Sequence, residues 1–163
     1  MKSIGIIPSR YSSTRFPGKP LIEIKGKSMI QRVYEQSSKS KKLSKLVVAT
    51  DDERIYNHVK SFGGDVLMTN INHTNGTSRC NEILTLLENE GEEFDVAINI
   101  QGDEPYINPE QIDSVIALFE NDKVQIGTLV KEISSSDELF NPNVVKAVIG
   151  NENNALYFSR RAI

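Results

Sequence analysis

The residues with the clearest chemical potential lie in a short segment near the N-terminus. Arg10, Arg15 and Lys19 follow one another there with no acidic residue among them. Cations this close repel one another unless an anion lies between them, and the Ser and Gly residues of the segment add hydroxyl and backbone N–H donors. A polyphosphate is therefore the ligand that we expect this loop to bind. The alternative is an ordinary charged loop that faces only solvent.

The position of the loop favours the polyphosphate. It follows the apolar run 4–8, which is typical of a buried strand. In α/β sheets, ligands bind at the carboxyl ends of strands, and the loop after the first strand is the common phosphate site. The loop is not a P-loop, because Pro20 follows Lys19. A GxGxxG pattern is also absent from the segment, so we expect no dinucleotide cofactor.

A second group of candidate residues follows the apolar run 95–100. Gln101, Gly102 and Asp103 come directly after it. A carboxylate at this point is placed to hold a phosphate-bound Mg²⁺, and the amide of Gln101 suits the edge of a nucleobase. Gly102 allows the backbone to approach a ligand closely. The alternative for Asp103 is a local hydrogen bond within a turn.

A third group lies between residues 72 and 79. Gly76 precedes a predicted helix start at Thr77 or Ser78, and a helix N-terminus favours anions. Arg79 falls in the first turn, where a cation opposes the helix dipole, so a facing phosphate or base would explain it. A solvated surface arginine is the alternative. His73 is interpreted as a loop residue, because no second histidine lies at metal-ligand spacing.

Strand and helix patterns alternate along the chain, which is typical of a parallel sheet with right-handed crossovers. Strands are predicted over 4–8, 46–50, 65–69 and 95–100, helices over 28–38, 52–62, 77–88 and 109–121, and a hairpin over 144–149 and 155–159. Asp51 or Asp52 is expected to cap the second helix. We predict an α/β fold with a Rossmann-like, mostly parallel sheet, helices on both faces, and a single nucleotide-binding domain over residues 1–163.

Composition narrows the classes of partner. The net charge of −3 over 163 residues argues against nucleic acid. Cys80 is the only cysteine, so we expect no disulfide and no cysteine metal site, and we interpret Cys80 as a semi-buried thiol. No apolar run has the length of a membrane span or a signal peptide, so no membrane partner and a cytoplasmic location are predicted.

Several of these motifs together resemble one enzyme family. They are the opening segment to Leu21, Ala49 to Arg54, Gly63-Gly64, His73 to Arg79, Gln101 to Pro105 (QGDEP), Asn141 to Lys146 (NPNVVK) and Ala155 to Arg160 (ALYFSR). In this order they are similar to the CMP-Kdo synthetases, the 3-deoxy-manno-octulosonate cytidylyltransferases of lipopolysaccharide synthesis. The resemblance covers the whole chain, and the three lettered strings are the specific part of it.

The resemblance implies a nucleotide-diphospho-sugar transferase type of fold that uses CTP, the acidic sugar Kdo and Mg²⁺. The anomeric hydroxyl of Kdo attacks the α-phosphorus and pyrophosphate leaves. The implied roles are triphosphate binding by Arg10 and Lys19 with Arg15 assisting, nucleotide binding by Ser9, Arg79 and Gln101, metal binding by Asp103, and recognition of the Kdo carboxylate by Arg160. Arg10, Lys19 and Asp103 are the residues expected to act in catalysis, through positioning and charge neutralisation.

The family continues well beyond Ile163. We therefore expect this chain to lack a later acidic metal ligand, most of the sugar-binding and dimer-forming region, and a C-terminal helix. A full-length family member is expected to be a homodimer, and apolar surface is expected around the hairpin. Two alternatives stay open: a cytidylyltransferase for another acidic sugar, and an inactive fragment that binds CTP without turnover.

Overall fold

The computed structural model describes residues 1–12 and 16–163. The chain divides into two compact units, Met1–Gly127 and Thr128–Ile163, which we describe separately. The single domain expected over 1–163 stays a prediction.

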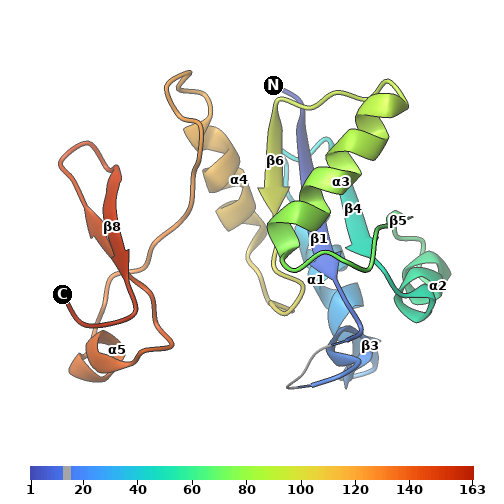
Figure 1. Cartoon of the computed structure of the whole chain (residues 1–163), viewed down its shortest axis with the longest axis horizontal. Helices are drawn as coiled ribbons and strands as arrows, with labels where there is room; N and C mark the ends of the chain where they lie inside the picture. Colours follow the sequence, from blue (N-terminus) through green and yellow to red (C-terminus); the bar gives the residue numbers. More distant parts are fainter. Residues whose placement is uncertain (13–15) are drawn as a thin grey trace. The chain divides into compact units, whose positions relative to one another are not determined.

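A parallel sheet forms the centre of the first unit (Figure 1). Its four strands are β1 (Ser3–Ser9), β4 (Lys45–Thr50), β5 (Val66–Met68) and β6 (Val96–Asn99), in the order β5-β4-β1-β6. All three neighbouring pairs are parallel, as predicted. Ile4, Ile6 and Ile7 of the central strand β1 are fully buried, which explains why this strand is a continuous apolar run.

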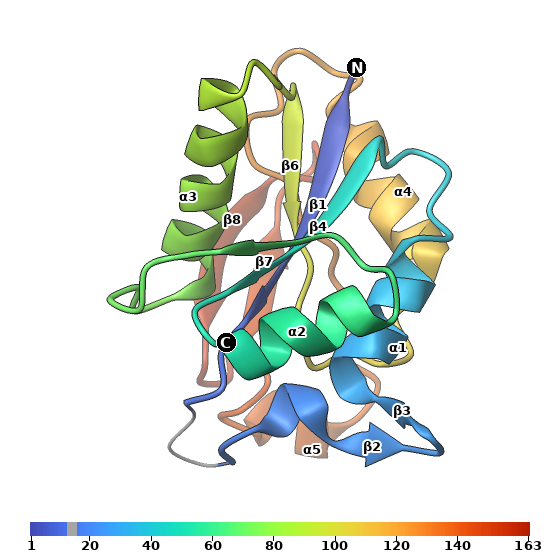
Figure 2. The same ribbon diagram turned by 90° about the vertical axis from the view of Figure 1, so that its right-hand side faces the viewer.

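Helices cover both faces of the sheet, as predicted (Figure 2). They are α1 (Met29–Ser37), α2 (Glu53–Ser61) and α4 (Pro109–Leu118) on one face, and α3 (Gly76–Asn89) on the other. The side chains of β1 alternate accordingly, because Ile7 packs with the first group and Ile6 packs with residues of α3. Among the described residues, no helix has both the length and the apolar character to cross a membrane.

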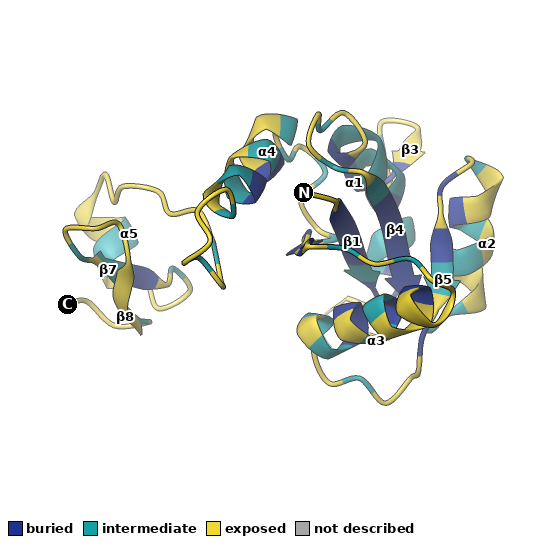
Figure 3. Cartoon of the chain, turned by 90° about the horizontal axis from the view of Figure 1, so that it is seen from above, coloured by how far each residue is buried: buried dark blue, intermediate teal, exposed yellow. Residues whose placement is uncertain are grey.

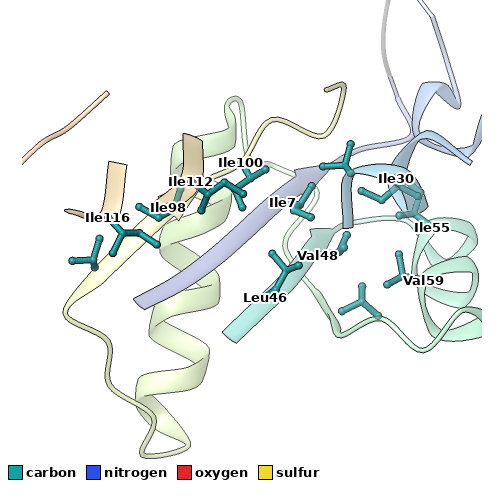
Figure 4. Packing of buried hydrophobic residues seen from close by; sticks show 13 residues of the cluster. Ile7, Ile30, Leu46, Val48, Ile55, Val59, Ile98, Ile100, Ile112 and Ile116 are labelled. Carbon is teal, nitrogen blue, oxygen red and sulfur yellow. The ribbon is translucent and has the colours of Figure 1, made fainter. Parts of the chain in front are cut away.

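The larger apolar cluster binds the three helices to the sheet (Figure 4). Ile30 of α1, Ile55 of α2 and Ile112 of α4 are at most 3% exposed and pack with Ile7 and Val48. Burying each such side chain contributes about 1.5–3 kcal/mol before the entropy of ordering is subtracted. The packed core therefore supports the strand ends that carry the candidate residues.

Side-chain caps set the helix starts. Asp52, rather than Asp51, caps α2 by accepting the N–H of Arg54. Asn75 caps α3 by accepting the N–H of Ser78, so that this helix begins at Gly76, slightly before the predicted start. Asn108 and Gln111 form a capping box at the start of α4, with Pro109 in its first turn as predicted.

Short elements after the cationic loop were not predicted. A 3₁₀ helix, η1, covers Lys19–Leu21, and the two-residue strands β2 (Glu23–Ile24) and β3 (Lys27–Ser28) form an antiparallel pair. These elements are too short to show the repeat of apolar residues by which a helix or a strand is predicted from a sequence.

The second unit contains the predicted hairpin. The strands β7 (Lys146–Ile149) and β8 (Ala155–Ser159) pair antiparallel, and α5 (Ser136–Phe140) precedes them. Most of β8 is exposed in Figure 3, with Leu156 at 62% and Tyr157 at 60%, in agreement with the expected apolar surface. Lys146 is only 3% exposed. Its ammonium group is satisfied by donating to the carbonyl oxygens of Asn141, Val144 and Arg160.

Candidate functional site

The order of the strands brings the first two candidate groups together. The chain passes from β1 to β4 on one side, whereas β6 pairs with β1 on the other side. Ile6 lies opposite Asn99, so the residues that follow the two strands leave the sheet at the same edge. A reversal of strand order of this kind is where open α/β sheets bind ligands.

A pocket of about 480 Å³ lies at this edge. It is lined by Pro8, Ser9, Arg10, Phe16, Lys19, Pro20, Gln101, Gly102 and Asp103. Five of the predicted site residues are therefore neighbours in space, namely Ser9, Arg10, Lys19, Gln101 and Asp103. The volume is within the range of small-molecule sites.

A smaller pocket of about 190 Å³ adjoins it. Its lining consists of Pro8, Ser9, Arg10, His73, Thr74, Asn75, Gly76, Arg79 and Gln101. Pro8, Ser9, Arg10 and Gln101 line both pockets, so the two form one site around the carboxyl end of β1. The loop before α3 thus contributes to the site, as the third candidate group predicted.

The hydroxyl of Ser9 is buried and has no partner within the described residues. Ser9 is 4% exposed, and its Oγ forms no hydrogen bond within the described residues. Leaving a buried hydroxyl unsatisfied costs about 1–3 kcal/mol. Since Ser9 lines both pockets, a ligand oxygen that accepts from this hydroxyl would recover that cost.

Lys19 and Asp103 both line the larger pocket and form an ion pair there. Lys19 Nζ lies 2.5 Å from Asp103 Oδ2, and the two side chains are 40% and 52% exposed. An ion pair this exposed contributes only about 0–1 kcal/mol. A polyphosphate at Lys19 and a cation at Asp103 could therefore separate the pair at small cost.

The predicted metal role of Asp103 rests on one carboxylate. Within residues 1–12 and 16–163, no group of three or more His, Cys, Asp or Glu side chains is arranged to hold a metal. Mg²⁺ commonly binds through one or two carboxylates together with phosphate oxygens and water. An exposed single carboxylate in a cationic pocket fits a shared ion of that kind, and the metal role stays a prediction.

Arg79 is held by the protein itself. It is 3% exposed, its Nη2 lies 2.6 Å from Asp51 Oδ2, and its Nη1 donates to Thr69 Oγ1. Asp51 provides the negative charge that a cation in the first turn of α3 requires. The interpretation of Arg79 as a solvated surface arginine is therefore wrong. Arg79 also lines the smaller pocket, and its nucleotide-binding role stays a prediction. Asp51 was missed, although it directly follows a buried strand.

His73 fixes the loop before α3, in agreement with its interpretation as a loop residue. Its Nδ1 lies 3.0 Å from Ser78 Oγ and its Nε2 lies 2.5 Å from Glu82 Oε2. Burial raises the pKa of Glu82, but hydrogen bonds from the Asn70 N–H and from His73 outweigh it, so that the net pKa is lowered. A charged Glu82 therefore anchors this loop at Asn70 and at His73.

Gly102 has a packing role that the sequence did not reveal. A Cβ at this position would lie 3.1 Å from the carbonyl oxygen of Pro8, which is closer than most Cβ contacts in proteins, so the backbone of β1 would have to shift slightly. The glycine therefore permits the loop after β6 to approach the backbone of β1. Its predicted close approach to a ligand stays a prediction.

Two predicted residues are not part of the pockets described above. Arg15 lies outside the described residues. Arg160 belongs to the second unit, where its Nη1 donates to the carbonyl oxygen of Pro142 at 3.3 Å. The proposed contact of Arg160 with a sugar carboxylate stays a prediction.

Comparison with known proteins gives a consistent result. The family model described as cytidylyltransferase matches residues 4–163. The chain is 54% identical over 167 residues to the 3-deoxy-manno-octulosonate cytidylyltransferase of Parabacteroides distasonis, covering 100% of this chain and 64% of the relative. It is 49% identical to the enzyme of the same name from Thermodesulfovibrio yellowstonii, covering 100% and 65%. The chain thus spans about two thirds of the length of these relatives.

Solved structures agree. The structure of CMP:2-keto-3-deoxy-manno-octonic acid synthetase complexed with CTP is similar with a TM-score of 0.91 and 39% identity, over 99% of this chain and 65% of that chain. A 4-diphosphocytidyl-2C-methyl-D-erythritol synthase is similar with a TM-score of 0.59 and 17% identity, over 83% and 65% of the two chains. The second likeness concerns the fold alone, and it agrees with the predicted Rossmann-like class.

Proposed function

Because the chain belongs to the cytidylyltransferase family, we propose that it serves the transfer of CMP from CTP to the anomeric hydroxyl of Kdo, with release of pyrophosphate, in lipopolysaccharide synthesis. The observation that carries the proposal is the pocket at the end of β1, whose lining includes Arg10, Lys19, Gln101 and Asp103. The proposal is also supported by the relatives named 3-deoxy-manno-octulosonate cytidylyltransferase and by the similar structure of a synthetase complexed with CTP.

In this proposal the triphosphate lies along the cationic loop. Arg10 and Lys19 neutralise its charge, and the buried hydroxyl of Ser9 donates to a phosphate or ribose oxygen. Gln101 and Arg79 border the smaller pocket, which we assign to the cytidine. The barrier falls because the reacting groups are oriented and the developing charge meets fixed donors, without a covalent intermediate.

We propose that Asp103 holds a Mg²⁺ ion, which supplies charge neutralisation at the α-phosphate and the leaving pyrophosphate. For this, Lys19 turns from Asp103 to the phosphates, and the exposed ion pair between them is weak enough to permit the exchange. The homodimer, the cytoplasmic location and the sugar contact of Arg160 stay predictions.

The test is an assay of pyrophosphate release with CTP and Kdo, next to calorimetry with CTP and ATP. We expect this chain to bind CTP more tightly than ATP, and we expect Mg²⁺-dependent pyrophosphate release from a version extended to the length of its relatives rather than from this chain alone. Lys19→Ala should weaken CTP binding roughly tenfold or more, the value of a charge-assisted contact. Asp103→Asn should abolish the Mg²⁺-dependent part of binding. Lys41→Ala, which removes an exposed cation outside the pocket, is the matched control.

Three results would change the assignment. Equal or tighter binding of ATP contradicts the cytidine site. CTP binding without turnover in the version extended to the length of the relatives favours a nucleotide-binding function. Faster turnover of another acidic sugar, such as a sialic-acid-like one, keeps the reaction and replaces the substrate.

A further inference from the structure

Tyr11 closes the base of the cationic loop. It directly follows Arg10, and its carbonyl oxygen accepts the N–H of Gly18 at 2.9 Å. Gly18 has a φ of 72°, in the left-handed region that favours glycine. Because Arg10 precedes Tyr11 and Lys19 follows Gly18, this hydrogen bond contributes to the spacing between Arg10 and Lys19.

The side chain of Tyr11 reinforces the closure. A Cβ at Gly18 would lie 3.1 Å from two carbon atoms of the Tyr11 ring, so the ring packs directly on the glycine. The guanidinium carbon of Arg54 lies 3.3 Å from the centroid of the same ring. An arginine at this distance is attracted by the ring through a cation–π interaction.

Arg54 is itself fixed in place. Its Nε and Nη2 donate to the two carboxylate oxygens of Asp52 at 2.9 and 2.7 Å. Asp52 caps α2, and the paired Arg54 is the main reason why the pKa of this carboxyl is lowered. Helix α2 follows β4, the neighbour of β1 in the sheet. The stack therefore ties the cationic loop to a rigid helix.

From these contacts we infer that Tyr11, stacked on Arg54, is a positioning residue that pre-organises Arg10 and Lys19 for a triphosphate. The inference rests on the proposed function. Neither Tyr11 nor Arg54 is among the described residues that line the two pockets. Their effect comes through the loop, because cations that are already spaced for the phosphates lose less conformational entropy on binding.

The experiment compares ligands with and without phosphates. Affinities for CTP and for inorganic tripolyphosphate are measured by calorimetry, and that for cytidine by NMR titration. The variants are Tyr11→Leu and Arg54→Gln, with Tyr11→Phe as the conservative replacement that keeps the ring. Lys60→Gln is the matched control, because it removes an exposed cation from the same helix.

Arg54→Gln and Tyr11→Leu are expected to bind CTP and tripolyphosphate about two- to fivefold more weakly, the range of an exposed cation–π contact. Their affinity for cytidine and their melting temperature should match the wild type. Tyr11→Phe and Lys60→Gln should bind all three ligands normally.

Each other outcome overturns one of the two proposals or both. Unchanged affinity for CTP in both variants overturns the positioning role and leaves the proposed function intact. An equal loss for cytidine, with a lower melting temperature, also overturns it, because the stack then only maintains the fold. A wild type that binds tripolyphosphate but not CTP contradicts the proposed function, while a selective loss in the variants still supports the positioning role. A wild type that binds neither ligand overturns both.

Discussion

The pair of Arg79 and Asp51 allows the sharpest prediction about this site. The two side chains are only 4% and 12% exposed. Replacing Asp51 by Asn leaves the guanidinium of Arg79 buried with no opposite charge at the 2.6 Å contact. Removing one partner of a buried ion pair costs about 3–5 kcal/mol. For a chain of this size, each kcal/mol lowers the melting temperature by about 2–4 °C. We therefore expect a decrease of roughly 6–20 °C.

The assay is urea and thermal unfolding of Asp51→Asn, Arg79→Met and the double variant. The double variant should be more stable than the sum of the single losses predicts, because it leaves no lone buried charge. Glu35→Gln is the control, because it breaks an exposed ion pair in which the side chains of Lys27 and Glu35 are 46% and 39% exposed. It should change the free energy of unfolding by no more than about 1 kcal/mol.

The same variants separate a structural role of Arg79 from a ligand-binding role. If Arg79 only supports the fold, Asp51→Asn and Arg79→Met should lower CTP affinity by similar factors. A loss of affinity confined to Arg79→Met would assign the guanidinium to the nucleotide. A stability loss below about 1 kcal/mol in Asp51→Asn would refute the reasoning, because the pair would then behave like an exposed one.

Two further predictions concern single side chains. Burial raises the pKa of the Cys80 thiol to about 11, so at pH 8 alkylation of native protein by iodoacetamide should be slow and should become fast in urea; fast labelling of native protein would contradict the burial. Burial raises the pKa of Asp113. Hydrogen bonds from the Ser40 hydroxyl and from the N–H groups of Lys41 and Lys42 lower this pKa by more, so the net pKa is lowered. The stability from Asp113 is therefore complete above its ordinary pKa of 3.8 and is lost as the pH falls through the lower folded-state value. Urea unfolding of wild type and Asp113→Asn between pH 7 and 2.5 should show a difference that shrinks only at the acid end.

Local patterns in the sequence were sufficient for the main elements. The apolar run before Thr50 and the caps Asp52 and Asn108 are local signals, because strand burial and helix capping act between residues close in the chain. The parallel direction of the strands followed from the alternation of these elements, whereas their order in the sheet did not. The placement of Arg10 and Asp103 at one edge of the sheet also followed, since both come after strands that run in the same direction, whereas their proximity depends on the pairing of β6 with β1.

The contacts that decide how the site residues behave could not be obtained in this way. Asp51 is far from Arg79 in sequence, and Lys19 is far from Asp103, so which charges pair depends on the register of the strands and the packing of α3. The stack of Tyr11 on Arg54 likewise requires the segment after β1 to meet the first turn of α2. The sequence by itself determined which residues lie at the carboxyl edge of the sheet, because that depends on local strand and helix periods. Only the tertiary structure decided which side chains are paired, buried or available there, because Coulomb energy and desolvation depend on distance and exposure rather than on position in the chain.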